Sequence, residues 1–434
     1  MSAVARMLLE QGYEVTGSDP RRSDLTASLE RAGARVYDRH AASLVEGAAC
    51  VIYSSSIRPD HVERLAAEKL GIPLRHRSWA LASLTRDHWA ACVCGTHGKT
   101  TTTAMLGRIF CAAGDDPTVV VGARVAELGG NVLIGSGGRM ILEADESDAS
   151  LLAYDPDAVL LTNVDADHLD HFEDVDEIQA TFRQFLQRLK PRGFWIGCGE
   201  CPRVMQLLRE FGDCGQSYGR GKGWDYRIED LGTLSGGGSE FVLSGPRGDL
   251  GRIRLKVFGE HNVLNAAGAA ALALKCGLRF EHVQKGLGGF GGAERRFQIL
   301  KRTDGYTVID DYAHHPTEIR ATLQAARSYG TGRIIAVFQP HRYTRTKKLC
   351  AEFAGCFELA DEVMITDVYG AGETPMEGVD GQWVAKLVSA CHPAVSYVPK
   401  LQLMAILKKV LPTGGVFLFM GAGDIGQIAR ELSG

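Results

Sequence analysis

The chain lacks any apolar run long enough to cross a membrane. Its longest run, from Ala266 to Leu274, ends at Lys275, well short of the ~20 apolar residues that a membrane-spanning helix needs. The first residues also lack a basic segment followed by an apolar core, which excludes a recognisable export signal. We therefore expect a cytoplasmic protein with no membrane span, whose eleven cysteines stay reduced.

Strong charge of one sign is also absent. The 48 basic and 52 acidic side chains leave a net charge of −4. Such a chain has no sequence-independent attraction to nucleic acid or to acidic membranes. We expect no nucleic-acid partner, and any anionic ligand must be bound by a local cluster of residues.

Paired cysteines at metal-binding spacing are scarce. Cys198 and Cys201 form one Cys-x-x-Cys pair, but no second pair at that spacing follows it. We interpret these two residues as buried or idle thiols without a zinc or redox role.

The N-terminal region lacks the opening strand and glycine-rich turn of a typical nucleotide-binding α/β unit. Residues 4–10 and 25–32 have helical patterns, while residues 13–16 and 49–53 resemble strands. This alternation predicts a Rossmann-like domain with a parallel sheet that misses its first strand. Asp19 and residues 54–56 follow strands, where they serve either as ligand contacts or as caps and turns.

The most informative segment that is present is residues 90–103, where an apolar strand runs into Gly-Thr-His-Gly-Lys-Thr. Gly95 and Gly98 permit close backbone approach, so N–H groups can face an anion at the start of a helix. Val93 stands where the common phosphate loop has its first glycine, which makes this the shorter form of that loop.

We expect Lys99 to hold nucleotide phosphates and Thr100 to bind Mg²⁺. We also expect Lys99 to lie on an exposed loop, so that replacing it leaves the fold intact. A plain strand-to-helix turn rich in glycine is the alternative interpretation of the segment.

Acidic side chains follow the next two predicted strands. Glu143 ends the strand at 140–142, and His168 lies among aspartates after the strand at 158–162. Hard cations take oxygen ligands and share them with substrate phosphates. We expect Glu143 to bind Mg²⁺ and His168 to have a catalytic or metal-binding role; a helix cap is the alternative for His168.

Residues 225–258 show alternating apolar residues typical of hairpin strands, so the glycines at 235–239 form a turn inside the domain. Asn262 and Asn265 then begin an apolar helix. Because they are three residues apart they share a face, and their amides can offer a donor and an acceptor to an adenine edge.

Polar clusters follow two further strands after the glycine-rich bend at 286–292. Residues 310–318 follow the strand at 306–309, and residues 339–345 follow the strand at 334–338. Histidine and arginine concentrated in this way suit the recognition of carboxylate or phosphate. Residues 421–426 fit the dinucleotide glycine pattern, but only eight residues follow them, too few for such a site.

Taken together, these segments resemble the Mur ligase family along the whole chain. Its motifs occur in the same order at 95–100, 143–150, 163–170, 259–266, 295–297, 310–318 and 338–346. The likeness is strongest to members that join L-alanine to UDP-N-acetylmuramate. It implies an α/β fold of three domains: a UDP-sugar-binding domain at 1–86, a P-loop ATPase-type central domain with a small antiparallel region at 87–293, and a Rossmann-like amino-acid-binding domain at 294–434.

The resemblance also implies ATP-driven amide formation through an acyl phosphate, with ATP and Mg²⁺ as cofactors. The implied catalytic residues are Lys99, His168 and Arg296. The implied metal ligands are Thr100, Glu143 and His168. The implied ATP contacts are Gly95, Thr96, His97, Gly98, Lys99, Thr100, Thr101, Asn262, Asn265 and Asp311. The implied pocket for alanine and the muramoyl group consists of Tyr312, His314, His341, Arg342 and Arg345.

Three alternatives stay open at this point. One is a Mur ligase relative that recycles a tripeptide, although the Gln-Pro-His-Arg-Tyr-Thr-Arg segment at 339–345 favours the alanine-adding members. The second is a P-loop phosphotransferase that acts on a hydroxyl group. The third is a nucleotide-binding protein with an impaired substrate domain.

Overall fold

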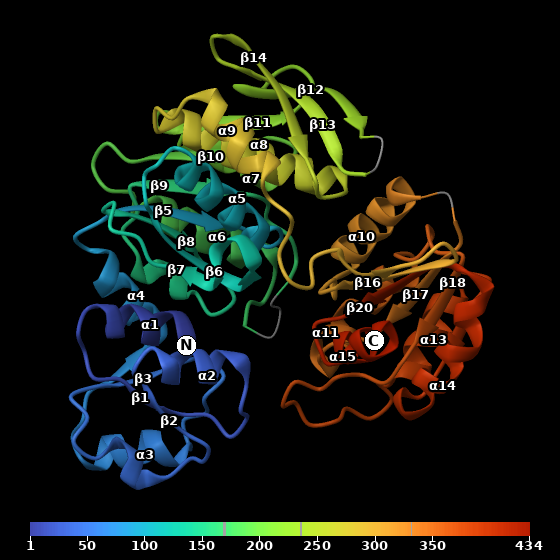
Figure 1. Ribbon diagram of the computed structural model, residues 1–434, viewed down its shortest axis with the longest axis horizontal. Helices are drawn as coiled ribbons and strands as arrows, with labels where there is room; N and C mark the ends of the chain where they lie inside the picture. The colour runs from blue at the N-terminus through green and yellow to red at the C-terminus, as the bar shows by residue number, and fades with distance from the viewer. Residues whose placement is uncertain (168–170, 235–236, 331) are drawn as a thin grey trace.

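The computed structural model describes residues 1–167, 171–234, 237–330 and 332–434, and it has three α/β regions (Figure 1). The expected α/β architecture is confirmed. Within these ranges no helix combines the length and the apolar character that crossing a bilayer requires.

The N-terminal region contains two separate two-stranded parallel sheets, β1–β2 and β3–β4. Its strands are β1 Thr16–Ser18, β2 Arg35–Tyr37, β3 Val51–Tyr53 and β4 Leu74–His76, and its helices are α1 Ser2–Glu10, α2 Asp24–Arg31, α3 Val62–Lys69 and α4 Arg77–Thr85. The first strand begins at Thr16, three residues later than the pattern predicted, and the Tyr13 N–H instead closes the end of α1 by donating to the Leu8 carbonyl at 3.0 Å. Each strand has one partner strand among the described residues.

The central region is built on a ten-stranded sheet in the order β14-β13-β12-β11-β10-β9-β5-β8-β6-β7. Its strands are β5 Trp89–Cys94, β6 Thr118–Val125, β7 Gly130–Leu133, β8 Arg139–Glu143, β9 Ala158–Leu161, β10 Phe194–Cys198, β11 Gly215–Arg220, β12 Tyr226–Thr233, β13 Ser239–Gly245 and β14 Gly248–Leu255. Its helices are α5 Lys99–Ala112, α6 Val175–Leu186, α7 Pro202–Glu210, α8 Glu260–Lys275 and α9 Phe280–Gly288. The predicted antiparallel region is confirmed, since β13 pairs antiparallel with both β12 and β14.

The C-terminal region has a six-stranded sheet in the order β15-β16-β20-β17-β18-β19, in which only the β15–β16 pair is antiparallel. Its strands are β15 Gln298–Arg302, β16 Tyr306–Asp311, β17 Ile334–Phe338, β18 Glu362–Ile365, β19 Val395–Tyr397 and β20 Gly415–Met420. Its helices are α10 Pro316–Tyr329, α11 Tyr343–Lys348, α12 Cys350–Ala354, α13 Gly381–Ser389, α14 Lys400–Val410 and α15 Ile425–Ser433.

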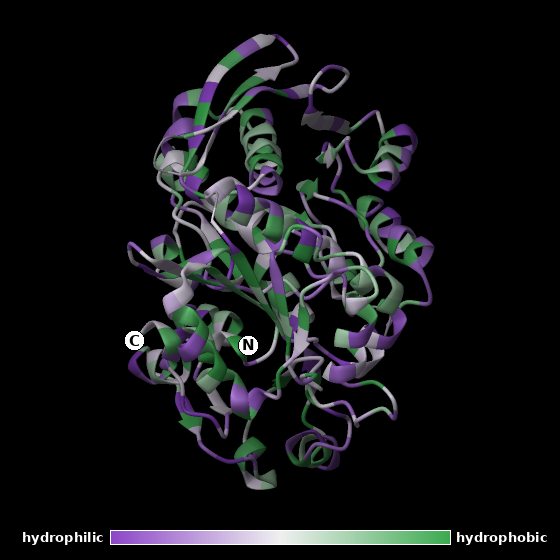
Figure 2. Ribbon diagram, turned by 90° about the vertical axis from the view of Figure 1, so that its right-hand side faces the viewer, coloured by the Kyte–Doolittle hydropathy of each residue, from purple (hydrophilic) through white to green (hydrophobic). Residues whose placement is uncertain are grey.

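The parallel strands at the centre of both large sheets are buried on their two faces. Along β5, Ala91 and Val93 pack into one hydrophobic cluster, and Cys92 and Cys94 into the cluster on the opposite face. This follows from the period of two in a strand. Figure 2 shows hydrophobic residues along the central strands and hydrophilic residues on the outer helices. The carboxyl ends of β5, β8 and β9 therefore emerge from a buried core.

Candidate active site

The phosphate loop joins β5 to α5 and has the backbone that its glycines predict. Gly95 has φ 123° and Gly98 has φ 84°, values that favour glycine. A Cβ at Gly95 would lie 2.2 Å from Thr162 Oγ1, and one at Gly98 would lie 2.6 Å from Asn265 Oδ1. Any side chain at either position would fill space that neighbouring atoms already occupy.

Lys99 is not exposed, and the expectation that it lies on an open loop is wrong. Its ammonium donates to the carbonyl oxygen of Gly95 at 2.7 Å and to the two carboxylate oxygens of Glu146 at 2.7 and 2.9 Å. The exposed fraction is 12% for the Lys99 side chain and 0% for that of Glu146. Burial alone would lower the pKa of Lys99, but the charges of Glu146, Asp145 and Glu143, with the hydrogen bonds to Glu146, together outweigh it and raise this pKa.

Thr100 and Glu143, both predicted to bind Mg²⁺, meet at the end of β8. The hydroxyl of Thr100 donates to Glu143 Oε1 at 2.9 Å, and the Gly122 N–H donates to Glu143 Oε2 at 2.5 Å. Burial raises the pKa of Glu143. The oxygen donors present here fit a hard cation. His168, the other predicted ligand, lies outside the described residues.

His97 points from the phosphate loop toward the C-terminal region. Its Nε2 lies 3.1 Å from Asp165 Oδ2, and its Nδ1 lies 3.4 Å from Glu318 Oε1. Burial opposes protonation of this ring, but the two carboxylates prevail and raise the pKa of His97 to about 9. Thr96 supports the same region, because its hydroxyl accepts the Asp165 N–H at 2.9 Å.

Asn262 and Asn265 share one face of α8, as predicted. Asn265 Nδ2 donates to Asn262 Oδ1 at 3.2 Å, and Asn262 Nδ2 donates to the Phe258 carbonyl at 2.7 Å. Neither caps the helix, since the N-cap is Gly259. Both asparagines are buried beside the phosphate loop, where the Asn265 side chain faces Gly98. An adenine contact stays a prediction.

Asp311, predicted to hold the ribose, uses its carboxylate inside its own region. It accepts hydrogen bonds from the Phe297 N–H at 2.6 Å, the Ala313 N–H at 2.7 Å and the Thr322 hydroxyl at 3.3 Å. Burial raises the pKa of Asp311 to about 6. These contacts account for the position of Asp311, and the ribose role stays a prediction. Thr101 is likewise buried, in the first turn of α5.

A cavity of about 660 Å³ opens at the seam between the central and C-terminal regions. It is lined by residues of both, among them Phe258, Arg296 and Gln298. Arg296 Nη1 lies 3.6 Å from Glu318 Oε1, and the Arg296 guanidinium lies 5.2 Å from the centre of the Tyr312 ring. The cavity has the size of a typical small-molecule site, and Arg296 gives it a cation.

The residues predicted to form the substrate pocket come together at the ends of β16 and β17. The ring of His314 lies 5.4 Å from that of Tyr312 and 5.7 Å from that of His341. Arg345 Nη1 lies 3.1 Å from His341 Nδ1. Burial and nearby cations lower the pKa of His341 to about 3, which leaves its ring neutral.

Arg342 begins the short helix α11 with φ 66°, a backbone conformation rare for a residue with a side chain. Its N–H donates to the Tyr369 carbonyl at 2.8 Å. Such strain is found where surrounding structure holds a functional turn in place.

Two buried carboxylates that the sequence reasoning did not select organise this site. Asp167 Oδ1 lies 2.9 Å from Arg345 Nη2, and this ion pair crosses the seam. Glu318 Oε2 accepts the N–H groups of His314 and His315 at 3.0 and 3.3 Å. A signal for Glu318 was present, because Pro316 marks the first turn of a helix, where acidic residues are favoured.

The comparisons with known proteins cover all three regions. The model of the Mur ligase family catalytic domain matches residues 1–89, that of the Mur ligase middle domain 93–273, and that of the Mur ligase glutamate ligase domain 295–423. The UDP-N-acetylmuramate–L-alanine ligase of Geobacter sp. (strain M21) is 40% identical over 435 residues, which cover 100% of this chain and 94% of the relative. The chain belongs to the Mur ligase family.

Further relatives support this family assignment. The UDP-N-acetylmuramate–L-alanine ligase of Salinibacter ruber is 43% identical, over 98% of this chain and 90% of that protein. Among solved structures, the UDP-N-acetylmuramate-alanine ligase of Thermotoga maritima matches with a TM-score of 0.84 and 29% identity, covering 100% of this chain and 95% of that one. The three regions of this Mur ligase are therefore the three domains of an α/β fold that it shares with the Thermotoga enzyme.

Proposed function

We propose that this Mur ligase joins L-alanine to the carboxylate of UDP-N-acetylmuramate in peptidoglycan precursor synthesis, with ATP as the energy source. The observation that carries the proposal is the arrangement at the seam. The phosphate loop of the central domain and the His314–His341–Arg345 cluster of the C-terminal domain meet through Asp165, Asp167 and Glu318. The names of the relatives that match the whole chain supply the substrates.

The reaction divides into two steps. The muramoyl carboxylate attacks the γ-phosphorus of ATP, so that a carboxyl O–P bond forms, the bond to ADP breaks, and an acyl phosphate results. The amine of alanine then attacks the acyl carbon, an amide forms, and phosphate leaves with the bonding electrons. Phosphoryl transfer of this kind depends on positioning and charge neutralisation more than on a protein nucleophile.

The residues divide between these steps. Lys99 and the N–H groups at the start of α5 bind the phosphates, Arg296 adds positive charge from the seam cavity, and the α8 asparagines face the base. Mg²⁺ on the oxygens of Thr100 and Glu143 would neutralise phosphate charge when bound. In the C-terminal domain, Arg342 and Arg345 bind carboxylates, while Tyr312, His314 and His341 line the alanine and muramoyl pocket.

The assay that tests the function measures phosphate release. We expect release only when ATP, UDP-N-acetylmuramate and L-alanine are all present. A stable phosphorylated product without the amino acid would indicate a phosphotransferase instead. Release with the tripeptide L-alanyl-γ-D-glutamyl-meso-diaminopimelate, but not with L-alanine, would indicate the activity named for a Neisseria relative of the same fold.

A variant pair tests the site. We expect Lys99→Met to lower kcat by on the order of 10²-fold or more, and also to destabilise the domain, because the buried carboxylate of Glu146 loses the ammonium group that it contacts. Lys99→Met combined with Glu146→Gln restores the stability but not the turnover. Ligase activity near that of the parent in the double variant would contradict the role of Lys99.

Glu143→Gln tests the proposed Mg²⁺ position separately. We expect it to raise the Mg²⁺ concentration needed for half-maximal ATP binding, since one charged oxygen ligand is lost. A Mg²⁺ titration identical to that of the parent would contradict this position.

A further inference from the structure

Three side chains from two domains converge on one point at the seam, and the proposed reaction gives them no joint role. His97 comes from the phosphate loop, Asp165 from the segment after β9, and His315 from the N-cap of α10. His97 Nε2 lies 3.1 Å and His315 Nδ1 lies 3.8 Å from Asp165 Oδ2, and the three atoms lie within 4.8 Å of one another. In the part of the chain that the structure describes, no other such group of potential ligands comes this close.

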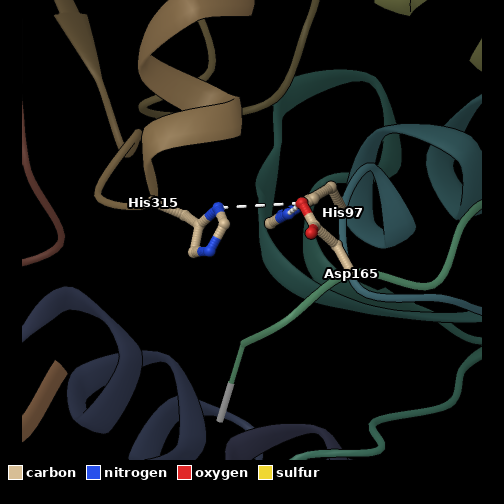
Figure 3. A group of neighbouring side chains, drawn as sticks. All are labelled: His97, Asp165 and His315. Carbon is tan, nitrogen blue, oxygen red and sulfur yellow. Dashed lines mark hydrogen bonds and ion pairs between the residues drawn. The ribbon is translucent and has the colours of Figure 1, made fainter. Parts of the chain in front are cut away.

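Both rings turn one nitrogen toward the Asp165 carboxylate (Figure 3). His315 Nε2 lies 3.0 Å from the Ala166 carbonyl, so this nitrogen carries the proton. His315 Nδ1 accepts the Thr317 N–H at 3.3 Å and lies 3.8 Å from Asp165 Oδ2, so a bound ion would replace this helix cap. His97 Nδ1 lies 3.4 Å from Glu318 Oε1, and a bound ion would replace the proton on Nε2, which faces Asp165. A histidine ligand of a metal ion typically has its other nitrogen against a carbonyl or a carboxylate in this way.

We propose that His97, Asp165 and His315 form a site for a transition-metal ion of the zinc class, which joins the phosphate loop to the C-terminal domain. Two imidazoles and one carboxylate are typical ligands of Zn²⁺, Co²⁺ or Ni²⁺. Mg²⁺ prefers oxygen ligands and suits the Thr100–Glu143 position instead. The two positions thus differ in the class of ion that they select.

The distances fit this class of ion. Ligand bonds of about 2.0–2.1 Å in a tetrahedron place ligand atoms about 3.3 Å apart. The separations from Asp165 Oδ2 are 3.1 and 3.8 Å, and the two histidine nitrogens lie within 4.8 Å of each other, so shifts of up to about 1.5 Å bring the three atoms to this spacing. The fourth position is left to water. Thr317, which is exposed and donates to Asp165 Oδ2 at 2.7 Å, lies on the solvent side and marks an entry path.

Equilibrium dialysis of the full chain tests the proposal. Chelator-treated protein is dialysed against Zn²⁺ with Mg²⁺ in large excess and without ATP, because ATP itself binds Zn²⁺. We expect about one Zn²⁺ per chain, and Co²⁺ should give the intense visible absorption of a four-coordinate site. His315→Asn should weaken binding by at least about tenfold, and Asp165→Asn by a similar factor.

The control variant is His61→Asn in the N-terminal domain. His61 also caps a helix, accepting the Glu63 N–H at 3.3 Å just as His315 accepts the Thr317 N–H at 3.3 Å. Asparagine preserves both caps, and the thermal unfolding of the two metal-free variants checks that they fold. If Asp165→Asn fails to fold, His315→Asn decides the question alone.

Two results would overturn the proposal. One is a Zn²⁺ affinity of His315→Asn equal to that of the parent or of His61→Asn. The other is displacement of Zn²⁺ by excess Mg²⁺ from the parent protein, which would indicate an oxygen-ligand site elsewhere.

Discussion

The two outer domains attach to the central domain in contrasting ways. On the N-terminal side, Arg77 Nη2 lies 3.1 Å from Asp145 Oδ2, and both side chains are about one-third exposed, at 33% and 34%. On the C-terminal side, the side chains of Arg345 and Asp167 are only 9% and 4% exposed. Exposed ion pairs contribute at most about 1 kcal/mol, whereas loss of one partner of a buried pair costs about 3–5 kcal/mol. With regard to ion pairs, the C-terminal seam is thus the tight one and the N-terminal seam the loose one, although Ala3, Met7 and Leu84 of the N-terminal domain join the hydrophobic cluster of the central sheet.

The sheets of the two outer domains also differ in the length and burial of their strands. In the N-terminal domain, β1 to β4 have three residues each, and none of these residues is fully buried. In the C-terminal domain, every residue of β17 is buried, as are all but the first residue of β16 and of β20. Sheets of two short strands are marginal on their own, so stability is concentrated in the central and C-terminal domains.

Hydrogen exchange should show the largest difference between the two domains. Amides of β1 to β4 should exchange through local opening, and those of β16, β17 and β20 only through global unfolding. We expect the protection factors to differ by roughly 10³-fold or more, equivalent to about 4 kcal/mol. Mass spectrometry of peptic fragments measures this. Equal protection in both sheets would contradict the comparison.

Glu318→Gln should lower kcat more than a matched change at the N-terminal seam does. The neutral side chain keeps the cap of α10 but removes the charge that His97, His314 and Arg296 share. We expect kcat to fall by on the order of 10²-fold, since a misplaced active-site group commonly costs this much. The matched control is Asp148→Asn at the N-terminal seam, where His76 Nε2 lies 3.6 Å from Asp148 Oδ2. Equal losses in the two variants would show that the seams do not differ.

The free energy of unfolding should also depend on pH through His97 at the C-terminal seam. Because the pKa of His97 is raised to about 9, the stability that its charge provides is fully present below the unfolded pKa near 6.5 and is lost as pH rises through 9. We expect the free energy of unfolding to fall over this range by on the order of 2 kcal/mol more in the parent than in His97→Asn. Urea titrations of both proteins at the two limits measure this difference. Parallel declines would contradict the assignment.

The smallest change in the free energy of unfolding is expected at the N-terminal seam. Arg77→Ala should change the free energy of unfolding by less than about 1 kcal/mol, because its partner Asp145 stays hydrated. High salt should reduce even this difference. A loss above about 2 kcal/mol, measured in urea at low and high salt, would place this seam in the class of buried contacts.

The sequence was sufficient to predict what local patterns determine. The apolar runs predicted β8, β9 and β17 to within one residue at each end, and Gly95 and Gly98 predicted the phosphate loop. The burial of Lys99 could not be predicted, because its partner Glu146 is 47 residues away along the chain. The same holds for the pairing of Asp167 with Arg345, 178 residues apart. Such contacts depend on how domains meet, and periodicity within one element carries no information about that.

The close approach of Gly98 to Asn265 has an evolutionary consequence. Because a Cβ at residue 98 would lie 2.6 Å from Asn265 Oδ1 and the backbone there has φ 84°, a smaller residue at 265 removes the clash but leaves the backbone strain. Glycine is thus expected to persist at residue 98 whatever residue stands at 265. A library randomised at both positions, 167 residues apart, and selected for ligase activity should return glycine at residue 98 in nearly every active clone.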